Sequence, residues 1–128
     1  MKKFILLMLS LILLTGCAAS GAQENNYRQI SMDEAVAMME EEKDYILLDV
    51  RTPQEFGEKH IPGAINIPNE TIGTEEIPEL PDKSQLILVY CRSGNRSKQA
   101  SQKLAALGYT NVVEFGGIND WPGETVRE

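Results

Sequence analysis

One cysteine with two arginines close behind it stands where a strand-like run meets a helix-like pattern. Cys91 directly follows the apolar residues 86–90, and the polar segment after it contains Arg92, Gly94 and Arg96. A thiol at the carboxyl end of a buried strand lies where open α/β sheets hold their ligands. Backbone amides of a turn, the start of a helix and nearby arginines all favour negative charge on sulfur. The sequence therefore predicts a nucleophilic cysteine in an anion-stabilising loop.

A buried structural cysteine is the alternative interpretation of Cys91, because free cysteine is among the most buried residue types. The segment after Cys91, however, is polar, contains glycine and carries two cations. A cysteine that only fills core volume needs none of these features. We therefore interpret Cys91 as a functional residue.

Four motifs, taken in order, resemble the rhodanese (thiosulfate sulfurtransferase) family. They are Leu-Leu-Asp-Val-Arg at 47–51, His-Ile-Pro-Gly-Ala-Ile-Asn-Ile-Pro at 60–68, Cys-Arg-Ser-Gly-Asn-Arg-Ser at 91–97 and Gly-Gly-Ile-Asn-Asp-Trp at 116–121. Four ordered motifs are more specific than any one of them, and the resemblance extends over roughly residues 28–126. It implies a rhodanese-like three-layer α/β/α domain with a mainly parallel five-stranded sheet.

The resemblance also implies a sulfurtransferase in which Cys91 alternates between thiolate and persulfide. The thiolate would take a sulfane sulfur from a donor such as thiosulfate and pass it to a thiol or to cyanide. Six residues of the loop are then the expected substrate-binding residues: Arg92, Ser93, Gly94, Asn95, Arg96 and Ser97. The expected partners are small sulfur-containing anions and thiols, with a protein acceptor as a further candidate. Neither a metal nor a cofactor is expected.

Within this loop, Arg92 is expected to project over the mouth of the site and to recognise the donor. Gly94 is expected to turn the chain with a positive φ. Arg96 stands near the start of the predicted helix, where the helix dipole disfavours a cation. A bound anion or a buried carboxylate must therefore offset that cost.

Three further motif residues have less definite roles. The family pattern places Asp49 and Arg51 beside the loop, at the carboxyl end of a neighbouring strand. They either orient the loop and substrate or form a structural ion pair, and the sequence leaves both interpretations open. His60, the one histidine of the chain, belongs to a turn motif, and we assign it no catalytic role.

Two other functions are alternatives to sulfur transfer. Phosphatases and arsenate reductases related to this fold use a Cys-x5-Arg loop, whereas Cys91 and Arg96 are spaced Cys-x4-Arg and residue 97 is serine. The shorter loop suits a sulfur atom better than a phosphate. A non-catalytic rhodanese-like module, which binds a partner or senses oxidants through Cys91, is the second alternative. The presence of the cysteine with both arginines favours catalysis.

Residues 1–16 resemble a lipoprotein signal peptide. Lys2 and Lys3 precede an apolar run at 4–14 that is too short to span a membrane, and residues 14–17 (Leu-Thr-Gly-Cys) resemble a bacterial lipobox. We expect an acylated Cys17 and a flexible tether at 17–26, followed by the rhodanese-like domain at 27–128. A lipid anchor on the extracytoplasmic side of a membrane of the cell envelope follows. A plain secretory signal is the alternative.

The composition limits the class of protein further. The chain has 128 residues, enough for one domain with a single core, and a net charge of −7. An acidic chain is not expected to bind nucleic acid, whose backbone attracts basic proteins. Once Cys17 is acylated, Cys91 has no partner for a disulfide, so neither a disulfide nor a zinc site is expected.

Strand-like and helix-like patterns alternate along the chain. The expected strands are 27–30, 45–50, 63–68, 85–90 and 111–115. The expected helices begin at 32 and 53, with a weak helix at 69–77 and a longer one at 97–107. Ser31 and Glu34 form a capping box before the first helix, and Pro53 is the first residue of the second. Gly108 ends the helix at 97–107. This alternation predicts a parallel sheet with helices on its faces.

Overall fold

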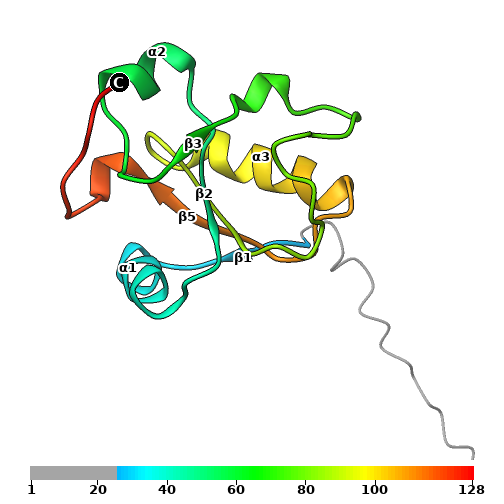
Figure 1. Cartoon of the computed structure of the whole chain (residues 1–128), viewed down its shortest axis with the longest axis horizontal. Coiled ribbons are helices and arrows are strands. Elements are labelled where there is room, and N and C mark those ends of the chain that lie inside the picture. The colour runs from blue at the N-terminus through cyan, green and yellow to red at the C-terminus, as the bar shows by residue number, and fades with distance from the viewer. Residues whose placement is uncertain (1–25) are drawn as a thin grey trace, which may run out of the picture.

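The computed structural model describes residues 26–128, which form an α/β domain (Figure 1). The expected signal peptide, Cys17 and all of the expected tether except Asn26 lie outside the described residues. Within the described part of the chain, no helix has the length and apolar character needed to cross a membrane.

All five strands of the described sheet run parallel, in the order β1-β5-β4-β2-β3. The strands are β1 (Arg28–Gln29), β2 (Ile46–Asp49), β3 (Ile65–Asn66), β4 (Ile87–Cys91) and β5 (Val112–Gly117). The central strand β4 is buried at every residue, which explains its unbroken apolar sequence. Because the strands are parallel, their carboxyl ends share one edge of the sheet, and Cys91 lies at that edge. The predicted sheet is confirmed.

Three α-helices and two short 3-10 helices surround the sheet in the described residues. They are α1 (Met32–Glu41), α2 (Pro53–Glu58), η2 (Asn69–Thr71), α3 (Asn95–Ala106) and η3 (Ile118–Asp120). The predicted capping box of Ser31 and Glu34 is present, and Thr52 with Glu55 forms a second one at the start of α2. Gly108 follows α3 with φ +100°, as a C-terminal stop requires.

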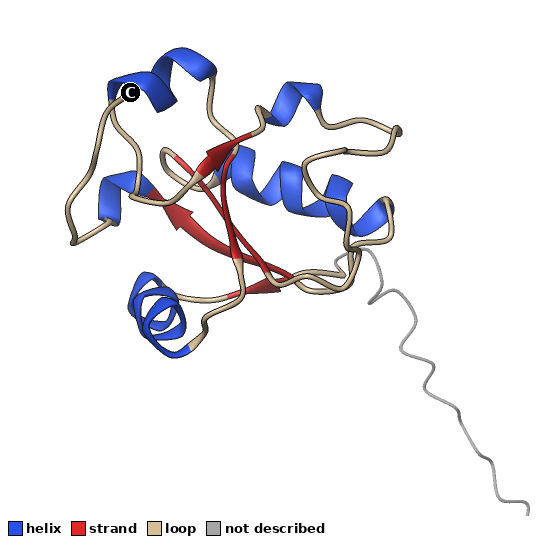
Figure 2. Ribbon diagram, in the orientation of Figure 1, coloured by secondary structure: helices blue, strands red, loops and turns tan. Residues whose placement is uncertain are grey.

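The core has two halves, one on each face of the sheet. Leu88 and Tyr90 of β4 pack with Ala35 of α1, whereas Val89 and Cys91 pack on the other face with residues of α3. Figure 2 shows α1 and α3 on opposite sides of the strands. Successive side chains of a strand point to opposite faces, so both halves draw on the same central strand. Cys91 therefore belongs to the α3 side of the sheet.

The structure corrects one predicted helix and several predicted element bounds. The helix predicted at 97–107 begins at Asn95, and the last strand continues to Gly117. The weak helix predicted at 69–77 is wrong, because only the 3-10 turn η2 forms there and an irregular segment follows. In that segment Ile72 and Ile77 are both buried. A spacing of five residues does not place two side chains on one helix face, so their burial favours an irregular chain.

Candidate active site

Cys91 ends β4, and three residues later α3 begins with Gly94 as its N-cap. The Gly94 amide donates a hydrogen bond to Cys91 Sγ at 3.0 Å. Gly94 has φ +115°, the left-handed conformation that the sequence predicted for it. Cys91 is 1% exposed, so the sulfur lies at the bottom of the loop. The loop thus brings an amide donor and the positive end of α3 to one buried sulfur atom.

The end of β5 forms the floor beneath this loop. Cys91 pairs with Gly117 in the sheet, and a Cβ atom on Gly117 would lie 2.0 Å from the carbonyl oxygen of Arg92. The Asn119 amide donates to the same carbonyl at 3.2 Å. The second glycine of the 116–121 motif, Gly117, is therefore required, because no side chain fits between β5 and the loop.

Ser97 is fully buried on the first turn of α3, where its hydroxyl meets the sulfur. Ser97 Oγ lies 3.4 Å from Cys91 Sγ and 2.5 Å from Oε2 of Glu114 on β5. Glu114 is 2% exposed, and its Oε2 also accepts the amide of Gly116 at 2.8 Å. Sequence reasoning did not single out Glu114. The signal was present, since a glutamate between Val113 and Phe115 interrupts an apolar strand.

Glu55 of α2 pairs with both arginines of the loop. Its Oε1 accepts from Arg96 Nη1 at 2.7 Å and its Oε2 accepts from Arg96 Nη2 at 3.0 Å, while Arg92 Nε donates to Oε2 at 3.1 Å. The hydrogen bonds from Arg96, helped by Thr52 and Arg92 and opposed by burial, hold the pKa of Glu55 well below its usual range. Sequence reasoning missed this residue too. Its position three residues after Thr52 was the available signal.

Of the two partners considered for Arg96, an anion and a carboxylate, the structure shows the carboxylate. A carboxylate, that of Glu55, offsets the cost of placing a cation in the first turn of α3. Arg92 is 57% exposed and also reaches Glu55, so it extends from the loop toward α2. Ser93 and Asn95 are exposed on the loop. The donor-binding roles of these residues remain predictions.

Asp49 and Arg51 form a buried, bidentate ion pair at the end of β2. Arg51 Nη2 lies 2.7 Å from Asp49 Oδ2, and the two residues are 2% and 0% exposed. Arg51 Nη2 also donates to the Lys59 carbonyl at 2.6 Å, and the Asn66 amide donates to the carbonyls of Asp49 and Arg51. These contacts join β2, β3 and the segment after α2. They match the structural interpretation of the pair.

His60 contacts neighbouring backbone and an aromatic ring. Its Nδ1 donates to the Phe56 carbonyl at 2.8 Å, and its ring stacks on Phe56 with centroids 3.7 Å apart. Its backbone pairs with Val126 near the end of the chain. His60 thus connects α2 to the C-terminal segment.

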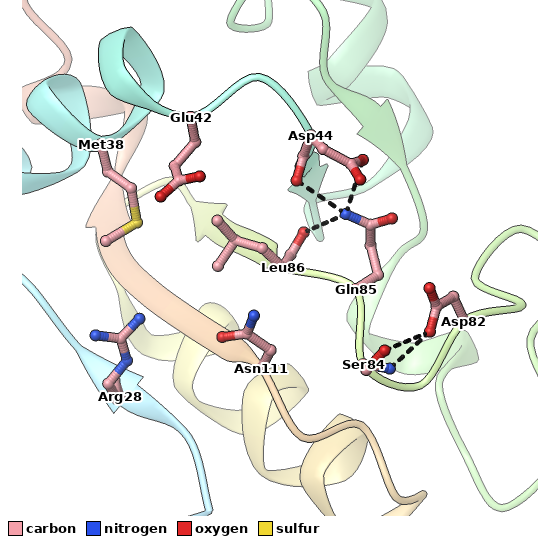
Figure 3. A pocket seen from close by; sticks show the side chains of 9 residues that line it. All are labelled: Arg28, Met38, Glu42, Asp44, Asp82, Ser84, Gln85, Leu86 and Asn111. Atoms are coloured by element: carbon pink, nitrogen blue, oxygen red, sulfur yellow. Dashed lines mark hydrogen bonds between the residues drawn. The ribbon is translucent and has the colours of Figure 1, made fainter.

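A pocket of about 360 Å³ lies at the opposite edge of the sheet (Figure 3). Residues just before β2, β4 and β5 line it, so it opens at the amino ends of the strands. Its polar groups bond to one another: Gln85 donates to the Asp44 carbonyl at 3.1 Å, and the Ser84 hydroxyl donates to Asp82 at 2.8 Å. In residues 26–128 no cluster of three or more histidine, cysteine or acidic side chains is placed to hold a metal ion. The loop at Cys91 is the candidate site because it brings a thiol, an amide donor and the start of α3 together.

Comparison with known proteins gives the family of this chain. The family model of the rhodanese-like domain matches residues 31–124. The thiosulfate sulfurtransferase PspE of Escherichia coli is 40% identical over 73 residues, which cover 57% of this chain and 70% of PspE. The adenylyltransferase and sulfurtransferase UBA4 of Meyerozyma guilliermondii is 39% identical over 89 residues, but the match spans only 21% of its length and 63% of this chain.

A solved structure has a similar fold. A rhodanese from E. coli, determined with anions, superposes with a TM-score of 0.60 at 38% identity and covers 66% of this chain and 99% of that one. This chain belongs to the rhodanese-like family. It is a sulfurtransferase, as relatives named thiosulfate sulfurtransferase indicate.

Proposed function

We propose that this protein moves a sulfane sulfur from a donor such as thiosulfate to a thiol or cyanide, through a persulfide on Cys91. The thiolate of Cys91 attacks the outer sulfur of thiosulfate, the S–S bond of the donor breaks, and sulfite leaves with the electron pair. The acceptor then attacks the terminal sulfur of the persulfide and returns Cys91 to the thiolate. The small sulfur anions and thiols of this cycle are the proposed partners, and a protein thiol is a further candidate acceptor.

The observation that carries the proposal is the hydrogen bond from the Gly94 amide to Cys91 Sγ at 3.0 Å. A donor already aimed at sulfur stabilises negative charge there without reorganisation during the reaction. The start of α3 adds the positive end of a helix dipole to the same position. Both place positive charge density next to the sulfur that attacks the donor.

The loop cations favour sulfur transfer over phosphate chemistry. Arg96 is bound bidentately by Glu55, so its two terminal nitrogens point to α2. Arg92 is attached to Glu55 by a single nitrogen and is the more exposed of the two. We propose that Arg92 recognises the anionic donor, while Arg96 fixes the shape of the loop.

We also propose that the protein works on the extracytoplasmic side of a membrane, anchored by lipid on Cys17. The support is the sequence of residues 1–17, with its basic start, short apolar run and lipobox-like end. Attachment through two or more acyl chains is stable, whereas a single chain is only marginal. Mass spectrometry of the protein extracted from membranes should find an acylated Cys17 as the first residue. A mature chain that starts elsewhere, or an unmodified Cys17, would contradict the anchor.

The transfer reaction is tested with the full chain in detergent, thiosulfate as donor and cyanide as acceptor. Thiocyanate should form, and Cys91→Ser should abolish its formation. Ser84→Ala, at the opposite edge of the sheet, is the matched control and should keep the wild-type rate. Without acceptor, thiosulfate should add the mass of one sulfur atom to the peptide containing Cys91. Equal turnover by Cys91→Ser, or hydrolysis of aryl phosphates without any sulfur transfer, would reject the proposal.

A further inference from the structure

A chain of two hydrogen bonds connects the reactive sulfur to a buried carboxylate. Cys91 Sγ lies 3.4 Å from Ser97 Oγ with the thiol as donor, and Ser97 Oγ lies 2.5 Å from Glu114 Oε2. All three side chains are at most 2% exposed. Proton exchange along this chain therefore needs no solvent molecule.

Glu114 occupies a position that the fold would otherwise fill with an apolar side chain. On β5, Val112 packs on the α3 side and Val113 packs on the α1 side, so alternation returns Glu114 to the α3 side. A buried carboxylate is costly unless it is paired, hydrogen-bonded or neutral. In residues 26–128, no lysine or arginine forms an ion pair with Glu114, and its Oε2 instead accepts from Ser97 and from the Gly116 amide.

The hydroxyl of Ser97 has one proton and several neighbours that could accept it. Ser97 Oγ is 2.9 Å from the Gly94 carbonyl, 3.3 Å from the Gly116 carbonyl and closest, at 2.5 Å, to Glu114 Oε2. With the proton on the Glu114 side, the hydroxyl oxygen is left to accept from the Cys91 thiol. When Cys91 is ionised, its sulfur has no proton to donate and must accept a hydrogen bond instead.

Few other charged groups surround the hydrogen bonds that join Cys91, Ser97 and Glu114. From β1, Gln29 pairs in register with Glu114, and Tyr27, just before β1, has a pKa raised by burial and by the charge of Glu114. The α3 side contributes Arg96, which is committed to Glu55, and Lys98, whose Nζ donates to the Gly94 carbonyl at 3.2 Å. From β4, Val89 lies opposite Glu114. When a proton moves along these hydrogen bonds, the changes of charge therefore fall mainly on Cys91 and Glu114.

We propose that Glu114 receives, through the Ser97 hydroxyl, the proton that Cys91 loses when it becomes the nucleophile. The thiol proton moves to Ser97 Oγ while the hydroxyl proton of Ser97 moves to Glu114 Oε2. The site then holds one negative charge, on sulfur, instead of two adjacent ones. When an acceptor takes the terminal sulfur, the electron pair of the broken S–S bond returns to Cys91, and the proton returns from Glu114 by the same path. This step rests on the proposed persulfide cycle, in which Glu114 is a positioning residue that acts through Ser97.

Alkylation of Cys91 by iodoacetamide tests the proposal without any sulfur donor. The full chain in detergent is alkylated over a range of pH, and the modified peptide containing Cys91 is quantified by mass spectrometry. Two groups that share a proton titrate in two steps that belong to the pair. The wild-type rate should therefore rise in two steps separated by a plateau, where one shared proton leaves a constant fraction of thiolate.

Glu114→Gln keeps the shape of the side chain but cannot take the proton, so it should lose the lower step. Ser97→Ala leaves Glu114 in place but removes the hydroxyl that hydrogen-bonds to both groups, so its plateau should hold a smaller fraction of thiolate than in the wild type. Ser97→Thr retains a hydroxyl and should keep the wild-type plateau. Glu40→Gln, on the exposed face of α1, is the matched control and should show two steps. A single step in the wild type, or two steps in Glu114→Gln, would overturn the proposal.

The serine variants decide the result if Glu114→Gln does not fold. A plateau in Ser97→Ala as high as in the wild type would then overturn the proposal. A lower plateau there, with the wild-type plateau in Ser97→Thr, would support it. Because iodoacetamide is not a sulfur donor, a two-step profile in a protein that fails to turn over thiosulfate would reject the sulfur-transfer proposal alone.

Discussion

Acid–arginine ion pairs form two groups at the carboxyl edge of the sheet, and the groups differ chiefly in burial. Asp49 and Arg51, at the end of β2, are almost completely buried. Glu55, on α2, is 15% exposed and holds two arginines that are 31% and 57% exposed. A fully buried pair must stay closed, because opening it leaves an uncompensated charge in the core. A partly solvated pair is weak enough to exchange partners.

We therefore expect different roles for the buried Asp49–Arg51 pair and for Glu55 with its two arginines. The contacts of Asp49 and Arg51 join β2, β3 and the segment after α2, so this pair fixes the frame around the site. Glu55 instead connects α2 to the loop that follows Cys91 through Arg92 and Arg96. The buried pair should therefore control stability, and the partly exposed one should control the loop.

The largest expected effect is on the buried pair. Asp49→Asn should lower the free energy of unfolding by about 3–5 kcal/mol, because it leaves the charge of Arg51 buried without a partner. The double variant Asp49→Leu/Arg51→Met removes both charges and should recover much of that loss. Urea unfolding followed by circular dichroism measures both changes. A loss below about 1 kcal/mol in Asp49→Asn would mean that the buried pair behaves like a surface pair.

Glu55→Gln should have a smaller effect on stability and a clear effect on turnover. Loss of a partly exposed ion pair and of a capping contact should cost about 1 kcal/mol. Both loop arginines lose their anchor, and misplacement of the loop should lower the rate of thiocyanate formation roughly tenfold, less than a full 1 Å displacement would. Glu58→Gln, exposed on the same helix, is the control. Unchanged turnover in Glu55→Gln would show that Glu55 does not position the loop.

Acid should reduce the stability difference between the wild type and Glu55→Gln. Hydrogen bonds from Arg96, with those of Thr52 and Arg92 and against the effect of burial, lower the pKa of Glu55 from its ordinary value of 4.5. A carboxylate with a lowered pKa contributes stability above its unfolded pKa and loses that contribution as pH falls. The difference in unfolding free energy should therefore be constant above about pH 4.5 and shrink below it. A difference that grows in acid would contradict this assignment.

The smallest expected effect is that of salt. Raising the ionic strength from about 0.1 M to 1 M shortens the screening length from roughly 10 Å to 3 Å and weakens exposed pairs most. The stability lost in Glu55→Gln should therefore decrease by a few tenths of a kcal/mol, while the loss in Asp49→Asn should stay nearly constant. Denaturant unfolding in urea at the two salt concentrations measures this contrast, since urea adds no ions. Equal salt sensitivity of the two losses would remove the distinction between the pairs.

Much of this fold could be predicted from local sequence. The run at 85–90, the capping box at Ser31 and the stop at Gly108 each gave the correct element, because apolar runs and caps act over a few residues. The segment 69–77 was predicted as a helix and is not one. Its conformation depends on the burial of Ile72 and Ile77 against the core, which no local pattern reports.

The sequence by itself predicted Cys91 as the nucleophile and determined the turn beside it. Cys91 follows an apolar run, and Gly94 supplies the positive φ that brings an amide to sulfur, so both features depend on residues within one loop. Only the tertiary structure decided the partners of that loop. Glu55 is 36 residues before Cys91, and Glu114 is on another strand, yet both carboxylates reach residues 92–97. Parallel strands bring distant segments to one edge of the sheet, so the ion pairs and the Ser97–Glu114 contact exist only once the chain has folded.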